Sequence, residues 1–382
     1  MINSKIALNL FTVLICFILT FSCKNHNKTF KNQNNAIDFQ PILDSIYNSN
    51  KDCVGLMVHV ESPEKKISWT GAIGVADTVT KIALQKDNPI LIASNTKTYI
   101  AAAILRLVED NKITLNDAVA TLISQKSREV LEKEGYNLEE IKLKHLLSHT
   151  SGIFDYAGSG EFFDFIENKP NYRWTRDEQI KLATSAGEPL GEVGMVFSYS
   201  DTNYLLLSEI IETITQKHFF IALRELLSFE KLNLNTTWFS SLEDYPNHTK
   251  PLAHQYSSSE RINSYSLDHS FDLYGGGGLA ATTKDLAMFL HYLFSNKIFD
   301  NPETIKLMYG EMVPEKAQEN NYFFGLSYTE FDGTGGLGHN GYWGSAVNYV
   351  PNLKTTIAVA VLERDQQSLL LDLNRSILEK LK

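Results

Sequence analysis

The sequence has little cysteine, little proline and no concentrated positive charge. Its 382 residues include three cysteines and ten prolines, and 35 lysines and arginines stand against 45 aspartates and glutamates. Three cysteines provide neither a disulfide framework nor a cysteine metal site. The net charge of −10 and the lack of a patch rich in Lys and Arg argue against nucleic acid as a partner.

The chain also lacks the common patterns of metal-binding and phosphate-binding proteins. No His-Glu-x-x-His pattern occurs, and the helical pair His145 and His149 has no acidic residues at ligand spacing. We interpret these two histidines as structural residues that order a helix end. The glycine run at residues 275–278 is not followed by the Lys-Ser/Thr of a phosphate loop. We therefore expect neither a metal nor an organic cofactor.

Residues 1–22 have the features of a lipoprotein signal peptide. A short start with one lysine precedes an apolar stretch at 6–21 that is too short to span a membrane comfortably, and a small residue precedes Cys23. We expect a lipidated Cys23 and a flexible tether over residues 23–37. The protein would then be attached to the outer or cytoplasmic membrane of a bacterial cell envelope, on its periplasmic or surface side. Plain secretion, for example into the periplasm, and an uncleaved anchor are the alternatives.

The remaining sequence alternates between strand and helix patterns. Strands are predicted at 54–61, 66–75, 323–331, 336–344, 345–350 and 355–362. Helices are predicted at 37–47, from Ser94 to about 110, and at 139–147, 177–183, 203–214, 219–228, 279–293 (with Thr282 or Thr283 near its cap) and 365–381. The simplest α+β architecture joins the first and last strands in one antiparallel sheet covered by the terminal helices. We expect one domain at 38–382, with an α/β sandwich lobe at about 38–92 and 279–382 and an all-helical lobe at about 93–278.

Ser94 and Lys97 lie where one of these helices begins. An apolar approach leads into Ser94, and Ile100, Ile104 and Leu107 follow at helical spacing. The serine and the lysine are then i and i+3 neighbours on one face, near the positive end of the helix dipole. This is a suitable environment for a serine that must lose its proton. The alternative is an ordinary N-cap serine followed by a surface lysine.

Two further stretches carry polar residues where helices or strands end. Tyr199-Ser-Asp201 precedes a predicted helix, and His339-Asn-Gly341 lies in a strand context where glycine lets another chain approach closely. Taken alone, the tyrosine would be a core residue and the histidine a surface residue.

Ser94-x-x-Lys97, Tyr199-Ser-Asp201 and His339-Asn-Gly341, in this order, resemble the three active-site elements of the class C β-lactamase and DD-peptidase family of serine hydrolases. The stretches at 145–152 and 277–286 also resemble this family, and the similarity covers nearly all of residues 38–382. The resemblance implies the β-lactamase/DD-peptidase-like fold and acyl transfer through a covalent intermediate.

Roles for single residues follow from the same resemblance. Ser94 would be the nucleophile, and Lys97 and Tyr199 would share the role of base or proton relay. The backbone N–H groups of Ser94 and Tyr342 would form the oxyanion hole. The expected substrate-binding residues are Asp201, His339, Asn340, Gly341 and Tyr342.

Two departures from the family pattern bear on the substrate. Asp201 stands where Asn is usual, so it can accept a hydrogen bond from Lys97 but cannot donate an amide N–H to a substrate carbonyl. His339 replaces the lysine of β-lactamases and is similar to DD-carboxypeptidases and D-aminopeptidases. The resemblance implies a D-amino-acid peptidase, DD-carboxypeptidase-like enzyme or related amidase or esterase, acting on a small molecule or peptide. The alternatives are a β-lactamase and a non-hydrolytic penicillin-binding sensor or scaffold.

Overall fold

The computed structural model describes residues 37–382, which form one compact unit. The predicted signal peptide, the lipidation of Cys23 and almost all of the tether lie outside the described residues and stay predictions. Within residues 37–382, no helix is both long enough and apolar enough to cross a membrane. Cys53 is a buried free thiol.

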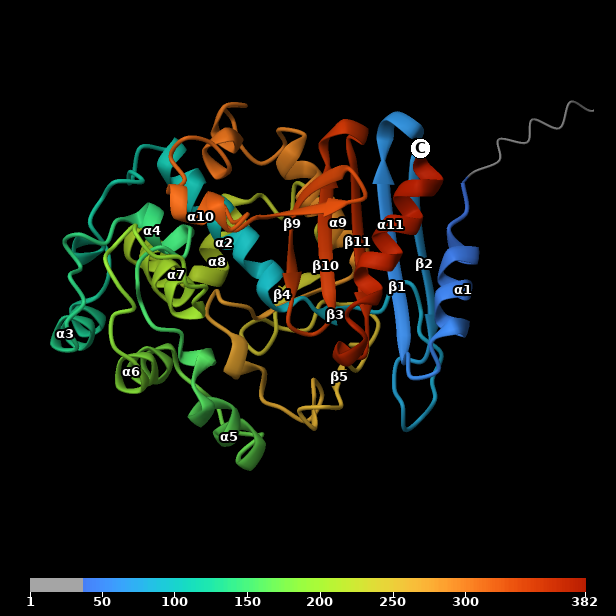
Figure 1. The fold of residues 1–382 in the computed structure, drawn as a ribbon, viewed down its shortest axis with the longest axis horizontal. Coiled ribbons are helices and arrows are strands. Elements are labelled where there is room, and N and C mark those ends of the chain that lie inside the picture. Colours follow the sequence, from blue (N-terminus) through green and yellow to red (C-terminus); the bar gives the residue numbers. More distant parts are fainter. Residues whose placement is uncertain (1–36) are drawn as a thin grey trace, which may run out of the picture. The chain divides into compact units, whose positions relative to one another are not determined.

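Strands and helices from the two ends of the described residues pack together, and the middle of the chain is mainly helical (Figure 1). The helices are α1 Gln40–Ser49, α2 Thr96–Glu109, α3 Gln125–Lys133, α4 Leu143–Leu147, α5 Gly160–Asn168, α6 Arg176–Ala186, α7 Asp201–Thr215, α8 Phe219–Leu226, α9 Thr283–Phe294, α10 Glu315–Glu319 and α11 Leu369–Leu381. The strands are β1 Gly55–Ser62, β2 Ile67–Gly74, β3 Ile90–Leu91, β4 Thr237–Phe239, β5 Tyr256–Ser257, β6 Ile262–Asn263, β7 Leu279–Ala281, β8 Ser327–Phe331, β9 Thr334–Gly341, β10 Ser345–Val350 and β11 Thr355–Val361.

The main sheet joins the two ends of the domain, as the sequence predicts. Its order is β2-β1-β11-β10-β9-β8, and each neighbouring pair is antiparallel. Strands β1 and β11 pair directly, with Met57 opposite Ala360. Both strands are buried along their whole length, because helices cover both faces of the sheet centre.

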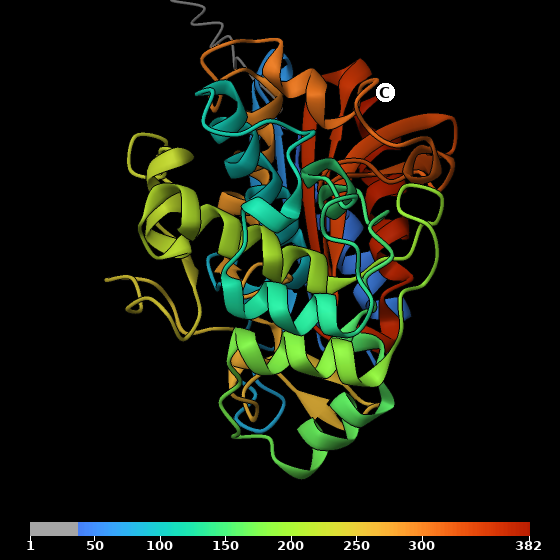
Figure 2. The same ribbon diagram turned by 90° about the vertical axis from the view of Figure 1, so that its left-hand side faces the viewer.

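Alternation along the strands sends side chains into two cores. Leu56 and Val58 of β1 pack with Val359 of β11 beneath α1 and α11, on the sheet face turned toward the viewer in Figure 1. Met57 and Ala360 point to the opposite face, which α9 covers, and belong to the larger core shared with the helices of the middle of the chain. Figure 2 shows these helices stacked against the sheet.

A small second sheet, in the order β3-β7-β4, carries the chain into α2. The fully buried side chain of Gln255 is hydrogen bonded to strand β3 of this sheet. Gln255 Oε1 accepts from the Leu91 amide at 2.8 Å, and its Nε2 donates at 3.0 Å to the carbonyls of Leu91 and Trp343. One glutamine therefore ties the segment before Ser94 to the turn after β9.

Most predicted elements are present with shifted ends, and the first three residues of one predicted helix form a strand instead. The predicted helix at 279–293 has its cap at Thr282, one of the two expected threonines, whose side chain accepts from the Asp285 amide, but the residues before the cap, Leu279–Ala281, form β7. The apolar run is equally suited to a buried strand, and pairing with Ile90 and Leu91 decides between them.

We predict that Gln255→Met destabilises the protein by about 2–4 kcal/mol, because the buried amide and carbonyl groups of Leu91 and the Trp343 carbonyl lose their partner. Urea denaturation followed by circular dichroism measures this change. Gln125→Met, at an exposed position of α3, is the matched control and should change stability by less than about 0.5 kcal/mol. Equal stability of the two variants would contradict the bridging role.

Candidate active site

Ser94 lies in a single turn of 3-10 helix, Ala93–Asn95, that leads from β3 into α2. Ala93 has φ +44°, in the left-handed region that non-glycine residues rarely adopt. This sharp turn points the serine out of the apolar segment that precedes it. Asn95 holds the turn, since its Nδ2 donates to the Ile92 carbonyl at 2.8 Å and to Ser345 Oγ at 2.9 Å.

Lys97 is fully buried, and each proton of its ammonium group has an acceptor. Its Nζ lies 3.0 Å from Ser94 Oγ, 2.5 Å from the Gly276 carbonyl and 2.5 Å from Asp201 Oδ1. Burial alone would lower the pKa of Lys97, but the negative charge of Asp201 raises it well above its ordinary value. The lysine is therefore a cation at rest and donates to the serine.

Tyr199 lies just before α7, beside these groups. The Lys97 ammonium is 4.9 Å from the centre of its ring. Burial raises the pKa of Tyr199 to about 12, and interactions with Lys97 and Ser94 oppose that rise. Tyr199, like Lys97, therefore holds its proton at neutral pH.

The carboxyl groups of Asp155 and Asp272 also lie near Lys97 and Asp201. Asp155 Oδ1 accepts from the Asp201 amide at 3.0 Å. Burial and the charge of Asp201 raise the pKa of Asp155 to about 7 and that of Asp272 to about 8. Near neutral pH the site therefore holds more carboxyl groups than cations, and part of its negative charge is neutralised by protons.

The glycine run at 275–278 lets this cluster form. A Cβ on Gly276 would lie 3.2 Å from the Asp201 Cβ, and one on Gly277 would lie 2.1 Å from a carboxyl oxygen of Asp272. A side chain at either glycine would therefore displace the carboxyl group of Asp201 or Asp272. Gly276 also supplies the carbonyl that binds Lys97.

The turn after β9 is pressed against the segment that carries Ser94. A Cβ on Gly341 would lie 2.3 Å from the Ile92 carbonyl oxygen and 2.8 Å from Asn95 Nδ2. The turn hydrogen bond runs from the Gly344 amide to the Gly341 carbonyl at 3.0 Å. The Tyr342 amide, at the second position of this turn, takes no part in that bond. The structure thus brings Ser94 and Tyr342 to adjoining segments.

The side chain of Asn340 is directed elsewhere. Asn340 pairs with Ala346, whose side chain belongs to the core beneath α11, whereas His339 pairs with Val347 of the larger core. Directly opposite residues of antiparallel strands share a face. Of these neighbours in sequence, His339 faces the Ser94 side, and Asn340 lines a hollow beside Leu370 of α11.

His339 is held by a chain of hydrogen bonds in which each donor is determined. The Ser200 amide donates to His149 Nδ1 at 3.1 Å, so His149 Nε2 carries the proton and donates to the Tyr322 hydroxyl at 3.1 Å. Tyr322 in turn donates to His339 Nε2 at 3.1 Å. His339 Nδ1–H then donates to the Asn340 carbonyl at 2.7 Å. Burial lowers the pKa of His339 to about 4 and that of His149 well below its ordinary value, so both rings are neutral.

Sequence reasoning missed Tyr322, and also the residues that hold Tyr342. The Tyr342 hydroxyl donates to Glu260, which pairs at 2.7 Å with Arg364, and the Arg364 guanidinium lies 4.2 Å from the centre of the Tyr342 ring. No motif marks these residues, because they come from separate loops. His145, by contrast, serves as expected of a structural residue, since its Nδ1 accepts from the Lys142 amide at the start of α4.

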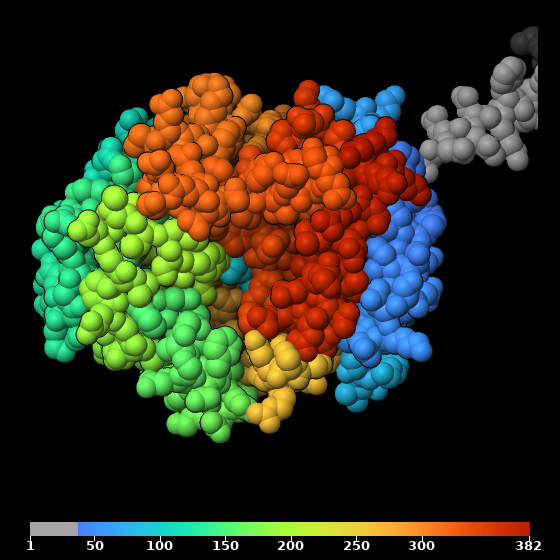
Figure 3. All heavy atoms as spheres, viewed as in Figure 1, coloured from blue at the N-terminus to red at the C-terminus, as the bar shows by residue number. Residues whose placement is uncertain are grey.

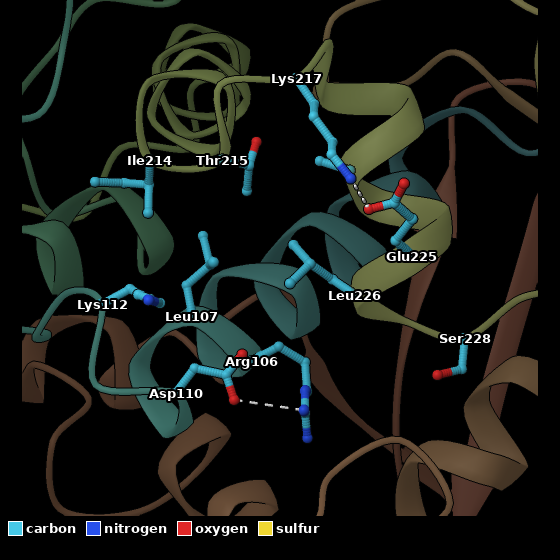
Figure 4. Close-up of a pocket in the computed structure, with 11 residues that line it drawn as sticks. Arg106, Leu107, Asp110, Lys112, Ile214, Thr215, Lys217, Glu225, Leu226 and Ser228 are labelled. Carbon is cyan, nitrogen blue, oxygen red and sulfur yellow. Dashed lines mark hydrogen bonds and ion pairs between the residues drawn. The ribbon is translucent and has the colours of Figure 1, made fainter.

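The site opens onto one face of the molecule. Figure 3 shows a hollow between the green helical segments and the orange and red segments near the C-terminus, with teal atoms of the α2 region at its floor. Another hollow, of about 480 Å³, lies at the far end of α2, between α7 and α8 (Figure 4). The rise of the helix places Arg106 in its wall about 18 Å from Ser94. Within residues 37–382, no group of His, Cys, Asp and Glu side chains is placed to hold a metal ion.

Comparisons with known proteins agree with this geometry. The sequence matches the protein family described as Beta-lactamase over residues 49–381. Protein flp of Staphylococcus aureus (strain MW2) is 32% identical over 154 residues, which cover 40% of this chain and 29% of that protein. The chain thus matches less than a third of the length of this curated relative.

Solved structures extend the likeness to the whole fold. D-amino acid amidase from Ochrobactrum anthropi SV3 has a TM-score of 0.73 at 19% identity, covering 91% of this chain and 100% of that chain. A D-stereospecific amidohydrolase from Streptomyces sp. has a TM-score of 0.72 at 21% identity, covering 87% and 98%. At these identities the likeness shows a shared fold.

We predict that Tyr322→Phe lowers the free energy of unfolding by about 2–4 kcal/mol, because the buried ring nitrogens of His149 and His339 lose their common partner. Chemical denaturation at pH 7 provides the measurement. Tyr328→Phe, at a position of β8 that is 41% exposed, is the matched control and should have little effect. The hydrogen-bonded chain would be contradicted by a Tyr322→Phe protein as stable as this control.

Proposed function

Because the chain belongs to the beta-lactamase family of serine hydrolases, we propose that it hydrolyses amides or esters of D-amino acids, including short peptides, through an acyl-enzyme on Ser94. The observation that carries this proposal is the contact between Ser94 Oγ and the Lys97 ammonium at 3.0 Å, beside the turn that bears the Tyr342 amide. A nucleophile, proton-transfer groups and amide donors then meet at one point.

In the proposed reaction, Ser94 Oγ attacks the substrate carbonyl carbon, and the backbone amides of Ser94 and Tyr342 stabilise the oxyanion. The serine proton passes through the coupled pair of Lys97 and Tyr199 to the leaving amine or alcohol as its bond to the carbonyl breaks. Water then attacks the acyl-enzyme ester, releases the acid and returns a proton to Ser94. Since Lys97 and Tyr199 are both protonated at rest, the reactive form with one proton fewer is a minor state at neutral pH.

The surroundings of Ser94 favour this substrate class over a β-lactam. His339, neutral and hydrogen bonded through both ring nitrogens, stands where β-lactamases carry a cationic lysine. The D-amino acid amidase and the D-stereospecific amidohydrolase share the fold over most of this chain. A β-lactamase remains the second candidate, on the strength of the family match, and a penicillin-binding sensor would share the same acylation step.

Turnover of matched substrates tests the proposal. The purified full chain should hydrolyse D-alanyl p-nitroanilide or a p-nitrophenyl ester, and Ser94→Ala should lower kcat/KM by at least about a thousandfold, because the nucleophile is lost. A chromogenic β-lactam and a fluorescent penicillin, run in parallel, separate the alternatives. Hydrolysis that survives Ser94→Ala would overturn the mechanism. A stable penicillin adduct without turnover of any substrate would favour the sensor.

A further inference from the structure

We propose that Asp201 selects substrates with a free, protonated amino group on the carbon next to the scissile carbonyl. This inference rests on the proposed function and specifies its substrate class as derivatives of unblocked amino acids. It assigns to Asp201 a contact with the acyl part of the substrate, in addition to its contact with Lys97.

The two oxygens of Asp201 have different surroundings. Oδ1 is buried and contacts the Lys97 ammonium at 2.5 Å, next to the backbone of Gly276. No residue in the described part of the chain donates a hydrogen bond to Oδ2, and the side chain keeps 13% of its surface exposed. Oδ2 is therefore the acceptor that a bound substrate can reach.

The position of Asp201 relative to the nucleophile fits the acyl part of a substrate. Ser94 Oγ and Asp201 Oδ1 both contact Lys97 Nζ, at 3.0 and 2.5 Å, so they are at most 5.5 Å apart. In an amino acid the α-nitrogen is separated from the carbonyl carbon by two bonds, a distance of about 2.5 Å. Oδ2 belongs to the same carboxylate as Oδ1, so an amino group on the acyl part is within reach of Asp201 when the carbonyl lies at Ser94.

A carboxylate accepts hydrogen bonds and cannot donate them. A substrate carbonyl placed at Oδ2 would meet a second acceptor, whereas an ammonium group would gain a charge-assisted hydrogen bond. An asparagine at this position would instead offer an N–H to a substrate carbonyl. The residue at position 201 therefore determines whether a donor or an acceptor on the substrate is favoured.

The charges around the site also favour a cation over an anion. Asp155 and Asp272 lie near enough to Asp201 for its charge to raise their pKa values. His339 cannot hold a substrate carboxylate, because its Nε2 accepts from Tyr322 and its Nδ1–H donates to Asn340. Lys97 already has an acceptor for each of its protons. A free carboxylate next to the scissile bond would find repulsion here.

The test compares two anilides that differ in the amino group alone, D-alanine p-nitroanilide and propionyl p-nitroanilide, with the full-length protein at pH 7. The ratio of their kcat/KM values should fall by at least about tenfold in Asp201→Asn, because the charge-assisted contact is lost. The ratio cancels any effect of the substitution on Lys97, which acts on both anilides. A ratio within twofold of that of the unaltered protein would overturn the assignment.

Asp155→Asn is the matched control, since it removes a nearby ionisable carboxyl group but leaves Asp201 Oδ2 in place, and the asparagine can still accept from the Asp201 amide. Its ratio should change much less than that of Asp201→Asn. An equal fall of the ratio in both variants would show that the overall negative charge of the site, and not a contact with Asp201, favours the amino group, and would overturn the proposal.

Binding to Ser94→Ala protein separates this inference from the proposed function. By calorimetry, D-alaninamide should bind at least about tenfold more tightly than propionamide, whether or not any anilide is hydrolysed. Absence of Ser94-dependent turnover together with this preference would overturn the hydrolase function alone. Equal affinities of the two amides would overturn the role of Asp201.

Discussion

The buried ammonium group of Lys97 is the interaction on which the rest of the site depends. Placing a charge in the protein interior costs several kcal/mol unless its partners replace water. Ser94 Oγ, the Gly276 carbonyl and the Asp201 carboxylate supply three acceptors for its three protons. They come from the 3-10 turn before α2, the glycine run and the start of α7, so one cation holds three segments together at Ser94.

The same arrangement sets the resting chemistry of the site. Asp201 keeps Lys97 charged, and burial keeps Tyr199 protonated, so neither is free to accept the serine proton at neutral pH. Around them, His149, Tyr322 and His339 form a neutral chain of hydrogen bonds in which each histidine has a fixed tautomer. On this side the charged centre therefore borders neutral, hydrogen-bonded rings, which preserve its geometry without adding a second cation.

The sequence predicted the fold class and the centre of the site for physical reasons that act locally. Ser94 and Lys97 are one helical turn apart, and the resemblance to class C β-lactamases and DD-peptidases, which the family match confirms, placed Tyr199, Asp201 and His339 near them. The pairing of first and last strands followed from the order of the elements, with strands at both ends of the domain and helices between them. The catalytic and substrate-binding roles of these residues remain proposals.

Other features depend on contacts between distant segments that no local pattern records. Tyr322 lies in a loop with no motif. Asp272 can lie near Asp201 because the glycine run at 275–278, which follows Asp272 in the sequence, leaves room for both side chains. Residues 279–281 form a strand because they pair with β3 and β4, and these pairings between distant segments leave no mark in the local sequence, which predicted a helix. The direction of the Asn340 side chain, in contrast, follows from strand alternation beside His339 and was open to prediction.

The most direct test of this account is the pH dependence of acylation by an uncharged ester, p-nitrophenyl propionate, in the unaltered protein and in Asp201→Asn. If Asp201 holds Lys97 in its charged form, the acylation rate constant of the unaltered protein rises with pH across the alkaline range. In Asp201→Asn the rise begins at least about one pH unit lower, since loss of the negative charge lowers the pKa of Lys97. The same pH dependence in both proteins would contradict the account.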